Sequence, residues 1–295
     1  MGKLFCFRFD VDTHCCVHEG MPALVGLGNR LDVPFTFFVN MGRAVSRRAF
    51  LRERVSSPVS PSRPQAAKLS ALTKLGWGGY LKAAALNPIV GGAATGLVRA
   101  AHESGHEIGL HGGRNHAVWQ LEASDWGAAR VAAEIDAVLP TLSRALGDTC
   151  PQGFASPGWT STPALDEVLA PRGFRYVADL HGPEPGSGKS GPTHDAERPD
   201  PPAALALPRV RTQLTGEPGG VAYLEHLRAR GFADADILRR FESDLDGGAR
   251  AMVVYDHPYH AGLRELTVIA RMVGIVRSAG FEVVPLHEVA RDGVT

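Results

Sequence analysis

Hydrophobic and polar positions alternate over residues 4–11, near the start of the chain. Side chains with a period of two project to opposite faces of a β-strand, so the phenylalanines of this segment face one way and Arg8 and Asp10 face the other. A mostly apolar run at 34–39 indicates a second, buried strand. The first strand therefore has one face suited to packing and one that carries charge.

Extended and helical patterns then alternate along most of the chain. Because strands that alternate with helices pair in parallel, this order predicts an α/β fold, and we expect one domain over residues 1–295, an imperfect barrel of about seven strands. The expected strands are 4–11, 34–39, 106–110, 153–155, 174–177, 205–207, 251–255 and 281–284, and the expected helical regions are 19–31, 125–146, 163–169, 220–246 and 263–279.

Two stretches interrupt the alternation. Residues 44–100 follow the second strand and combine an arginine-rich start with a Ser/Pro stretch, weakly amphipathic helices and an apolar end. We interpret them as a helical insertion that forms a lid or faces an anionic membrane surface. Residues 182–202 are rich in glycine and proline, which predicts a flexible loop.

Composition narrows the function classes. The 31 Lys and Arg residues balance 31 Asp and Glu residues, which argues against a nucleic-acid-binding protein because such proteins carry a basic excess. The longest uncharged run, 83–98, is shorter than the about 20 apolar residues of a membrane-spanning helix, and we recognise no signal peptide. The four cysteines form no CxxC pair. We therefore expect a cytoplasmic protein with reduced thiols.

Three polar clusters each follow a predicted strand. Asp10 and Asp12 share one strand face, where two like charges call for a cation or a proton between them. The segment 111–116 (HGGRNH) offers two imidazoles in one tight turn, which can reach a common Zn²⁺ ion. The segment 255–260 (YDHPYH) closes a later strand. Since the carboxyl ends of barrel strands hold catalytic groups, the three clusters together predict one site.

The chain contains four longer motifs: FRFDVDT (7–13), SGHEIGLHGGRNH (104–116), FASPGW (154–159) and VVYDHP (253–258). They are accompanied by EGxP (19–22), FF…MGR (37–43) and a GW pair (76–77). These motifs resemble those of the polysaccharide deacetylases of the NodB-homology group, carbohydrate esterase family four. The likeness is strongest toward the ArnD-type formamido-arabinose phosphoundecaprenol deformylases and covers residues 4–290. It implies a distorted (β/α) barrel that uses a divalent metal ion to hydrolyse an amide on an amino sugar.

The resemblance implies that Asp12, His111 and a second histidine bind the metal ion, with Asp10 as general base and His257 as general acid. The family's usual second histidine lies four residues after the first, where this chain has Asn115. His116, one position later, is our expected ligand, and an Asn115 oxygen is the alternative. Zn²⁺ is the expected ion, with Co²⁺, Ni²⁺ or Mn²⁺ as alternatives.

Other residues are expected to support this chemistry. Many relatives pair the base with an arginine in the third motif, which FASPGW lacks, and Arg8 on the same strand face as the base is expected to replace it. A backbone N–H near Ser156–Gly158 would hold the oxyanion. Trp159 is a candidate for stacking on a sugar or for packing, and Asp179, at another strand end, for orienting a catalytic group.

The predicted function is metal-dependent removal of a formyl or acetyl group from an amino sugar linked to polyprenyl phosphate. Such a substrate would bring the protein to the inner face of a membrane; we predict no nucleic-acid and no protein partner. Three alternatives remain. They are a deacetylase of soluble sugars or polysaccharides, an inactive relative that binds lipid-linked glycan, and a serine hydrolase that uses Ser156 and His257.

Overall fold

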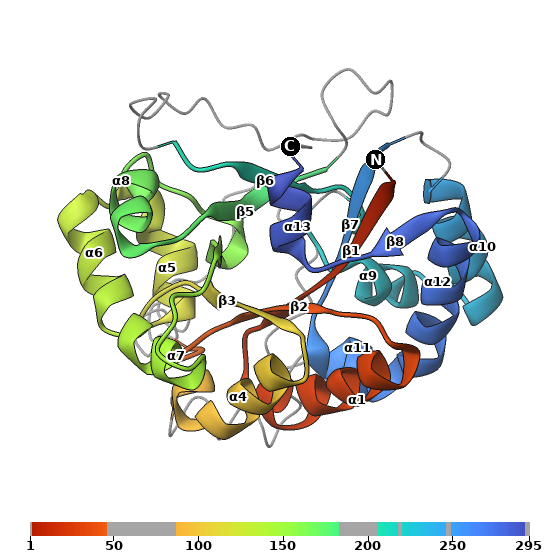
Figure 1. Cartoon of the computed structure of the whole chain (residues 1–295), viewed down its shortest axis with the longest axis horizontal. Helices are drawn as coiled ribbons and strands as arrows, with labels where there is room; N and C mark the ends of the chain where they lie inside the picture. Colours follow the sequence, from red (N-terminus) through yellow and green to blue (C-terminus); the bar gives the residue numbers. More distant parts are fainter. Residues whose placement is uncertain (1, 46–86, 183–205, 218–219, 246–248, 293–295) are drawn as a thin grey trace, which may run out of the picture.

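Parallel strands form the centre of the molecule, and helices surround them (Figure 1). The structure is a computed structural model that describes residues 2–45, 87–182, 206–217, 220–245 and 249–292, so most of the expected insertion 44–100 and nearly all of the expected loop 182–202 lie outside the described residues. The strands are β1 (Lys3–Val11), β2 (Thr36–Val39), β3 (Glu107–His111), β4 (Gly153–Ala155), β5 (Tyr176–His181), β6 (Arg209–Thr212), β7 (Ala251–Asp256) and β8 (Phe281–Val283).

The sheet closes almost completely on itself. Its strand order is β6-β5-β4-β3-β2-β1-β7, and β8 pairs with the start of β1. Beyond β6, Leu214 forms a parallel bridge with Val254 of β7, and the Gln213 side chain accepts the backbone N–H of Val253 at 2.9 Å. These contacts join the two edges of the sheet. The expected distorted (β/α) barrel of about seven strands is therefore confirmed.

Helices cover the outer face, with α6 and α8 on the left of Figure 1 and α10 and α12 on the right. The phenylalanines of β1 are buried beneath them, as the alternating pattern predicts. The helices are α1 (Met21–Leu31), α4 (Thr95–Glu103), α5 (His116–Glu122), α6 (Ala128–Asp136), α7 (Leu139–Ala145), α8 (Leu165–Leu169), α9 (Tyr223–Ala229), α10 (Asp234–Leu245), α11 (Pro258–Arg264), α12 (Leu266–Ser278) and α13 (Leu286–Arg291).

The inner face of the barrel carries the other residues of β1. Cys6 packs there with Phe38 and Tyr176, and α13 covers this amino-terminal end of the strands. Arg8 and Asp10 follow along the same face toward the carboxyl ends. The barrel interior is therefore closed by α13 at one end and lined with charged side chains at the other.

Two predictions of local structure were wrong. The expected helix at 125–146 is split into α6 and α7, because the ring of Pro140 would clash with the carbonyl of Asp136, where α6 ends. The expected strand at 205–207 instead lies at Arg209–Thr212. Its sequence RVRT has too few apolar residues for a hydrophobic pattern to reveal it.

Candidate metal centre

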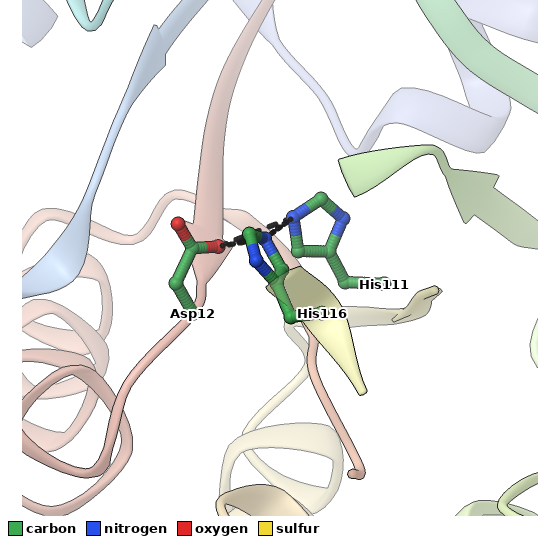
Figure 2. Close-up of side chains that lie close together, drawn as sticks. All are labelled: Asp12, His111 and His116. Atoms are coloured by element: carbon green, nitrogen blue, oxygen red, sulfur yellow. Dashed lines mark hydrogen bonds and ion pairs between the residues drawn. The ribbon is translucent and has the colours of Figure 1, made fainter. Parts of the chain in front are cut away.

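Asp12, His111 and His116 converge where β1 and β3 end (Figure 2). Asp12 Oδ1 lies 3.1 Å from His111 Nε2 and 3.3 Å from His116 Nε2, and the two nitrogens are 3.2 Å apart. His111 Nδ1 is 2.9 Å from the Ala155 carbonyl oxygen, so Nδ1 carries the hydrogen and Nε2 directs a lone pair at its neighbours. Two nitrogens and one oxygen that converge in this way fit a divalent cation such as Zn²⁺.

The electrostatics of this cluster favour a positive charge. Burial opposes ionisation of Asp12, but His116, His257 and His111 outweigh burial and hold the pKa of Asp12 well below its ordinary value. Burial by itself would lower the pKa of His111, yet Asp10 and Asp12 raise it above its ordinary value. Both shifts mean that the site stabilises a cation next to the carboxylates, whether a proton or a metal ion.

Asn115 and His116 take different places in the structure. Asn115 is the N-cap of α5, where its Oδ1 accepts the backbone N–H of Val118 at 3.1 Å and its Nδ2 donates to the Val45 carbonyl at 2.9 Å. Both polar ends of this side chain are thus bound to backbone groups. His116, the first residue of α5, faces the metal cluster instead. Of the two candidate ligands, the structure brings His116 to Asp12.

The stretch after β2 holds the start of α5 in place. The Arg43 N–H donates to the Arg114 carbonyl at 2.8 Å, and the Arg43 carbonyl accepts the N–H of His116 at 2.8 Å. A β-carbon at Gly42 would lie 2.4 Å from the carbonyl oxygen of Gly113, so a larger residue would push the two segments apart. The glycine of the MGR motif therefore positions a candidate ligand.

Asp10 is bound by Arg8 in a bidentate ion pair. Arg8 Nε donates to Oδ1 at 2.9 Å and Nη2 donates to Oδ2 at 2.8 Å, and both residues are buried. The guanidinium also donates to acceptors on β5 and β6, and it lies 4.4 Å from the Trp159 ring centroid. Arg8 thus occupies the place expected for the cationic partner of the base. Asp10 Oδ2 lies 3.8 Å from His111 Nε2, beside the metal cluster.

His257 lies on the other side of Asp12. Its Nε2 is 3.2 Å from Asp12 Oδ2 and 2.9 Å from the Tyr255 hydroxyl. Its Nδ1 is 2.6 Å from Oε1 of Glu225, a residue of α9 that is 3% exposed and that also accepts the Tyr259 hydroxyl at 2.6 Å. The sequence pattern did not indicate Glu225. The one available signal was an acidic residue among the apolar residues of a helix.

Asp256 attaches α9 to the site. Phe9 and Asp256 are register partners, so Asp256 projects to the outer face of the barrel like Phe9. There both carboxylate oxygens accept the backbone N–H of Leu224 at 3.1 Å. Asp256 thereby caps the start of α9, whose own N-cap residue provides no side-chain acceptor. Burial and the nearby Glu225 carboxylate raise the pKa of Asp256 well above its ordinary value. Adjacent residues, Asp256 and His257, therefore bind α9 at two points.

Two glycines set the position of α11, which begins directly after His257. A β-carbon at Gly20 would lie 2.1 Å from the Pro258 carbonyl oxygen, and one at Gly262 would lie 2.2 Å from the Gly20 carbonyl oxygen. Because neither glycine has a β-carbon, α11 can cross the π-helical turn at Cys16–Gly20 at close range. The glycine of the EGxP motif thus helps to place His257.

The remaining candidates have mixed positions. Ser156 is buried, and its Oγ has no hydrogen-bond partner in the part of the chain that the structure describes. Gly158 adopts a left-handed φ of 60°, and the Trp159 indole donates to the Gly220 carbonyl at 2.8 Å. Asp179 lies 3.8 Å from Arg209 Nε, and Arg209 also binds Asp166 of α8. The acidic residue that the structure brings to His257 Nδ1 is Glu225.

A sequence profile of the polysaccharide deacetylase family matches residues 3–177. A protein of Shewanella sediminis, described as the 4-deoxy-4-formamido-L-arabinose-phosphoundecaprenol deformylase ArnD, is 33% identical over 184 residues. The aligned region is 59% of this chain and 56% of that protein, so the match spans little more than half of the relative.

Solved structures share the fold at low sequence identity. A protein of Mycobacterium smegmatis, described as a polysaccharide deacetylase, has a TM-score of 0.58 and 16% identity over 99% of this chain and 91% of its own. A family 4 acetyl xylan esterase from Clostridium thermocellum, in complex with a cobalt ion, has a TM-score of 0.51 and 13% identity over 99% of this chain and 93% of its own.

Proposed function

The chain belongs to the polysaccharide deacetylase family, as its motifs predicted, and we propose that it hydrolyses the N-acyl amide of an amino sugar at a divalent metal ion held by Asp12, His111 and His116. The observation that carries this proposal is the meeting of Asp12 Oδ1 with two imidazole nitrogens. A candidate base stands on one side of this cluster and a candidate acid on the other.

The chain's own residues supply acid and base. A bound divalent ion such as Zn²⁺ would polarise the acyl group and lower the pKa of water. Asp10, whose carboxylate Arg8 holds in place, removes a proton from the attacking water. His257, held through Nδ1 by Glu225, supplies a proton for the leaving nitrogen from Nε2. A backbone N–H near Ser156–Gly158 stabilises the negative charge that develops on the acyl oxygen.

An inactive glycan-binding relative was considered because two residues that are usual in the family are missing from their motifs. In the structure, other residues take the places of both. Asn115 stands where many relatives have a histidine, but His116 reaches the cluster from the first turn of α5. The third motif lacks an arginine, but Arg8 binds Asp10 with two hydrogen bonds. Both substitutes support an active enzyme.

The substrate that we propose is an amino sugar linked to polyprenyl phosphate, bearing a formyl or acetyl group. The 33% identical protein is described as acting on such a lipid-linked sugar. The large apolar side chains that are exposed in the described residues are Ile89, Leu121 and Leu263, on segments that follow β2, β3 and β7. Ile89 bridges to the exposed Arg43, so this rim combines apolar and basic groups, which suits an anionic membrane surface.

A contact of this kind would be peripheral. Within the described ranges, the helices are too short or too polar to cross a bilayer.

Mass spectrometry provides the test of function. The purified chain is incubated with polyprenyl-phosphate amino sugars that carry formyl or acetyl groups and, separately, with soluble N-acetylated oligosaccharides. We expect loss of the acyl group from the lipid-linked sugars, abolition by a chelator and recovery on addition of Zn²⁺. Loss only from soluble sugars would correct the substrate. Activity that resists the chelator would favour the serine hydrolase, and a chain that neither binds metal nor releases acyl groups would overturn the proposal.

A further inference from the structure

The hydroxyl group of Tyr255 has no part in the mechanism above, although it lies at the proton-carrying end of His257. Tyr255 is the register partner of Arg8, so its side chain projects to the inner face of the barrel, where it is 6% exposed. Its hydroxyl oxygen lies 2.9 Å from His257 Nε2. A buried hydroxyl at this position needs a reason beyond packing.

The surroundings of His257 leave one nitrogen for proton exchange. Nδ1 lies 2.6 Å from Glu225 Oε1, so this nitrogen keeps its hydrogen. Nε2 lies between Asp12 Oδ2 at 3.2 Å and the Tyr255 hydroxyl at 2.9 Å. An ionised carboxylate only accepts hydrogen bonds, whereas a hydroxyl accepts one and donates another. Of these two neighbours, Tyr255 is the one that can receive a proton from Nε2 and donate a different proton elsewhere.

The ring of Tyr255 is fixed in this place. Its centroid lies 5.3 Å from that of Trp159 with the rings nearly perpendicular, and 5.4 Å from the Arg8 guanidinium carbon. Burial, together with the Asp10 and Asp12 carboxylates, raises the pKa of Tyr255 well above its ordinary value. The group is therefore a hydroxyl, with a proton to give, at neutral pH.

We propose that Tyr255 is a catalytic residue that relays the proton from His257 to the leaving nitrogen, a role that rests on the proposed function. As the bond between the acyl carbon and nitrogen breaks, its electron pair remains on nitrogen. The nitrogen takes the hydroxyl proton of Tyr255, and the tyrosine oxygen takes the proton of His257 Nε2. Tyrosine ends as a hydroxyl again, His257 ends neutral, and one proton has moved from the histidine to the amine.

Two substrates with different leaving groups separate a relay from a structural role. An amide needs its nitrogen protonated, whereas p-nitrophenolate leaves without a proton. For Tyr255→Phe we expect kcat to fall by about 10²-fold on an N-acyl amino sugar and by less than about threefold on the p-nitrophenyl ester of the same acyl group. Tyr223→Phe removes a hydroxyl that binds Asp244, outside the site, and is expected to leave both activities unchanged.

A measurement on the wild type adds an independent check. A relay moves two protons in one step, so the rate of amide hydrolysis in mixtures of H₂O and D₂O should curve with deuterium fraction, whereas one proton in flight gives a straight line. An equal loss on amide and ester in Tyr255→Phe, an unchanged amide rate, or a straight line overturns the relay and leaves the proposed function standing. A wild type inactive on both substrates overturns both.

Discussion

The two ends of the barrel interior bury carboxylates in opposite ways. At the end covered by α13, Glu107 accepts the hydroxyls of Thr36 at 2.9 Å and Tyr176 at 2.8 Å, and also the backbone N–H of His287 at 3.1 Å. At the other end, Asp12 Oδ1 lies 3.1 Å from His111 Nε2 and 3.3 Å from His116 Nε2, and these imidazoles can also bind a metal ion. A carboxylate with hydroxyl and backbone donors stabilises the fold, whereas one that faces two imidazoles can share a cation with them.

One strand supplies both ends. Glu107 is the first residue of β3 and His111 is the last, and side chains two and four residues apart on a strand share a face. Gly109 lies between them, and a β-carbon there would come within 2.5 Å of the Phe38 ring. The missing side chain lets Phe38 fill the barrel between the two clusters. The comparison therefore predicts that substitutions at the two ends have separate effects.

The largest effect is expected from Asp12→Asn, at the metal end. An amide has no negative charge to balance a divalent ion, so we expect loss of bound metal and a fall in activity of about 10³-fold or more. The metal-free protein should be slightly less stable at neutral pH than the metal-free wild type, because the histidines that hold the pKa of Asp12 low lose a carboxylate partner. Metal analysis, the acyl-release assay and thermal unfolding measure these three quantities.

The exposed carboxylate of Asp125 provides a matched control for this change. Asp125→Asn is expected to leave metal content and activity as they are. An Asp12→Asn protein that retains stoichiometric metal would show that Asp12 is not a ligand, and the contrast between the two ends of the barrel would fail.

A smaller loss is expected from Glu225→Gln, which keeps the shape of the side chain but removes the charge next to His257 Nδ1. Without this carboxylate the protonated imidazole is less stable and its orientation less fixed, so kcat should fall by about 10²-fold with metal content unchanged. Steady-state kinetics and metal analysis check this expectation. Glu242→Gln on the exposed face of α10 is the control, and equal kinetics for the two variants would remove Glu225 from the site.

The opposite end of the barrel is tested by Glu107→Gln. The amide keeps an acceptor but loses the charge that binds Tyr176, Thr36 and His287, so the free energy of unfolding should fall by about 1–3 kcal/mol. The activity of the folded protein should stay within about twofold, because Phe38 separates Glu107 from the metal end. Denaturant titration and kinetics measure the two effects. A large fall in kcat with unchanged stability would show that the ends are coupled.

The sequence allowed different parts of the molecule to be predicted to different extents. The clusters that contain Asp12, His111 and His116 were expected at one site because each follows a predicted strand, and the carboxyl ends of parallel strands meet at one end of a barrel. The choice of these three residues as ligands came from the family resemblance. The strand β6 was misplaced because its RVRT sequence alternates arginine with a single valine. Patterns that belong to one segment, such as a strand followed by a charged turn, could be recognised without tertiary information.

Contacts that depend on the assembled fold could not be predicted in this way. Glu225 meets His257 because the outward-facing Asp256 caps α9, and no spacing within either segment reveals this. Glu107 belongs to a strand in which every residue is buried, and its donors come from β2, β5 and α13. Sequence motifs do not reveal the roles of these two carboxylates, because their partners lie on elements that are distant in sequence.

The smallest effect is expected from His287→Gln, a substitution at the end of the barrel that α13 covers. Its effect on thermal stability should depend on pH, because His287 lies next to the Glu107 carboxylate. The Glu107 carboxylate, 3.3 Å from His287 Nδ1, raises the pKa of this histidine against the opposing effect of burial. The neighbouring Glu288 also raises this pKa and Arg291 lowers it, while Tyr176 contacts Glu107 as a neutral hydroxyl. The protonated imidazole is therefore more stable in the folded than in the unfolded chain.

The sign of the pH dependence follows from that difference. Since the folded pKa exceeds the unfolded value of about 6.5, the stabilisation is fully present below about pH 6.5 and is lost as the pH rises through the folded pKa. The side chain is 30% exposed, so His287→Gln should lower Tm by only about 1–2 °C at pH 5.5 and by no measurable amount at pH 9. In the Glu107→Gln background the same substitution should have no effect at either pH, because the partner charge is gone. A loss of Tm that is equal at both pH values would assign the role of His287 to packing of α13 and not to its charge.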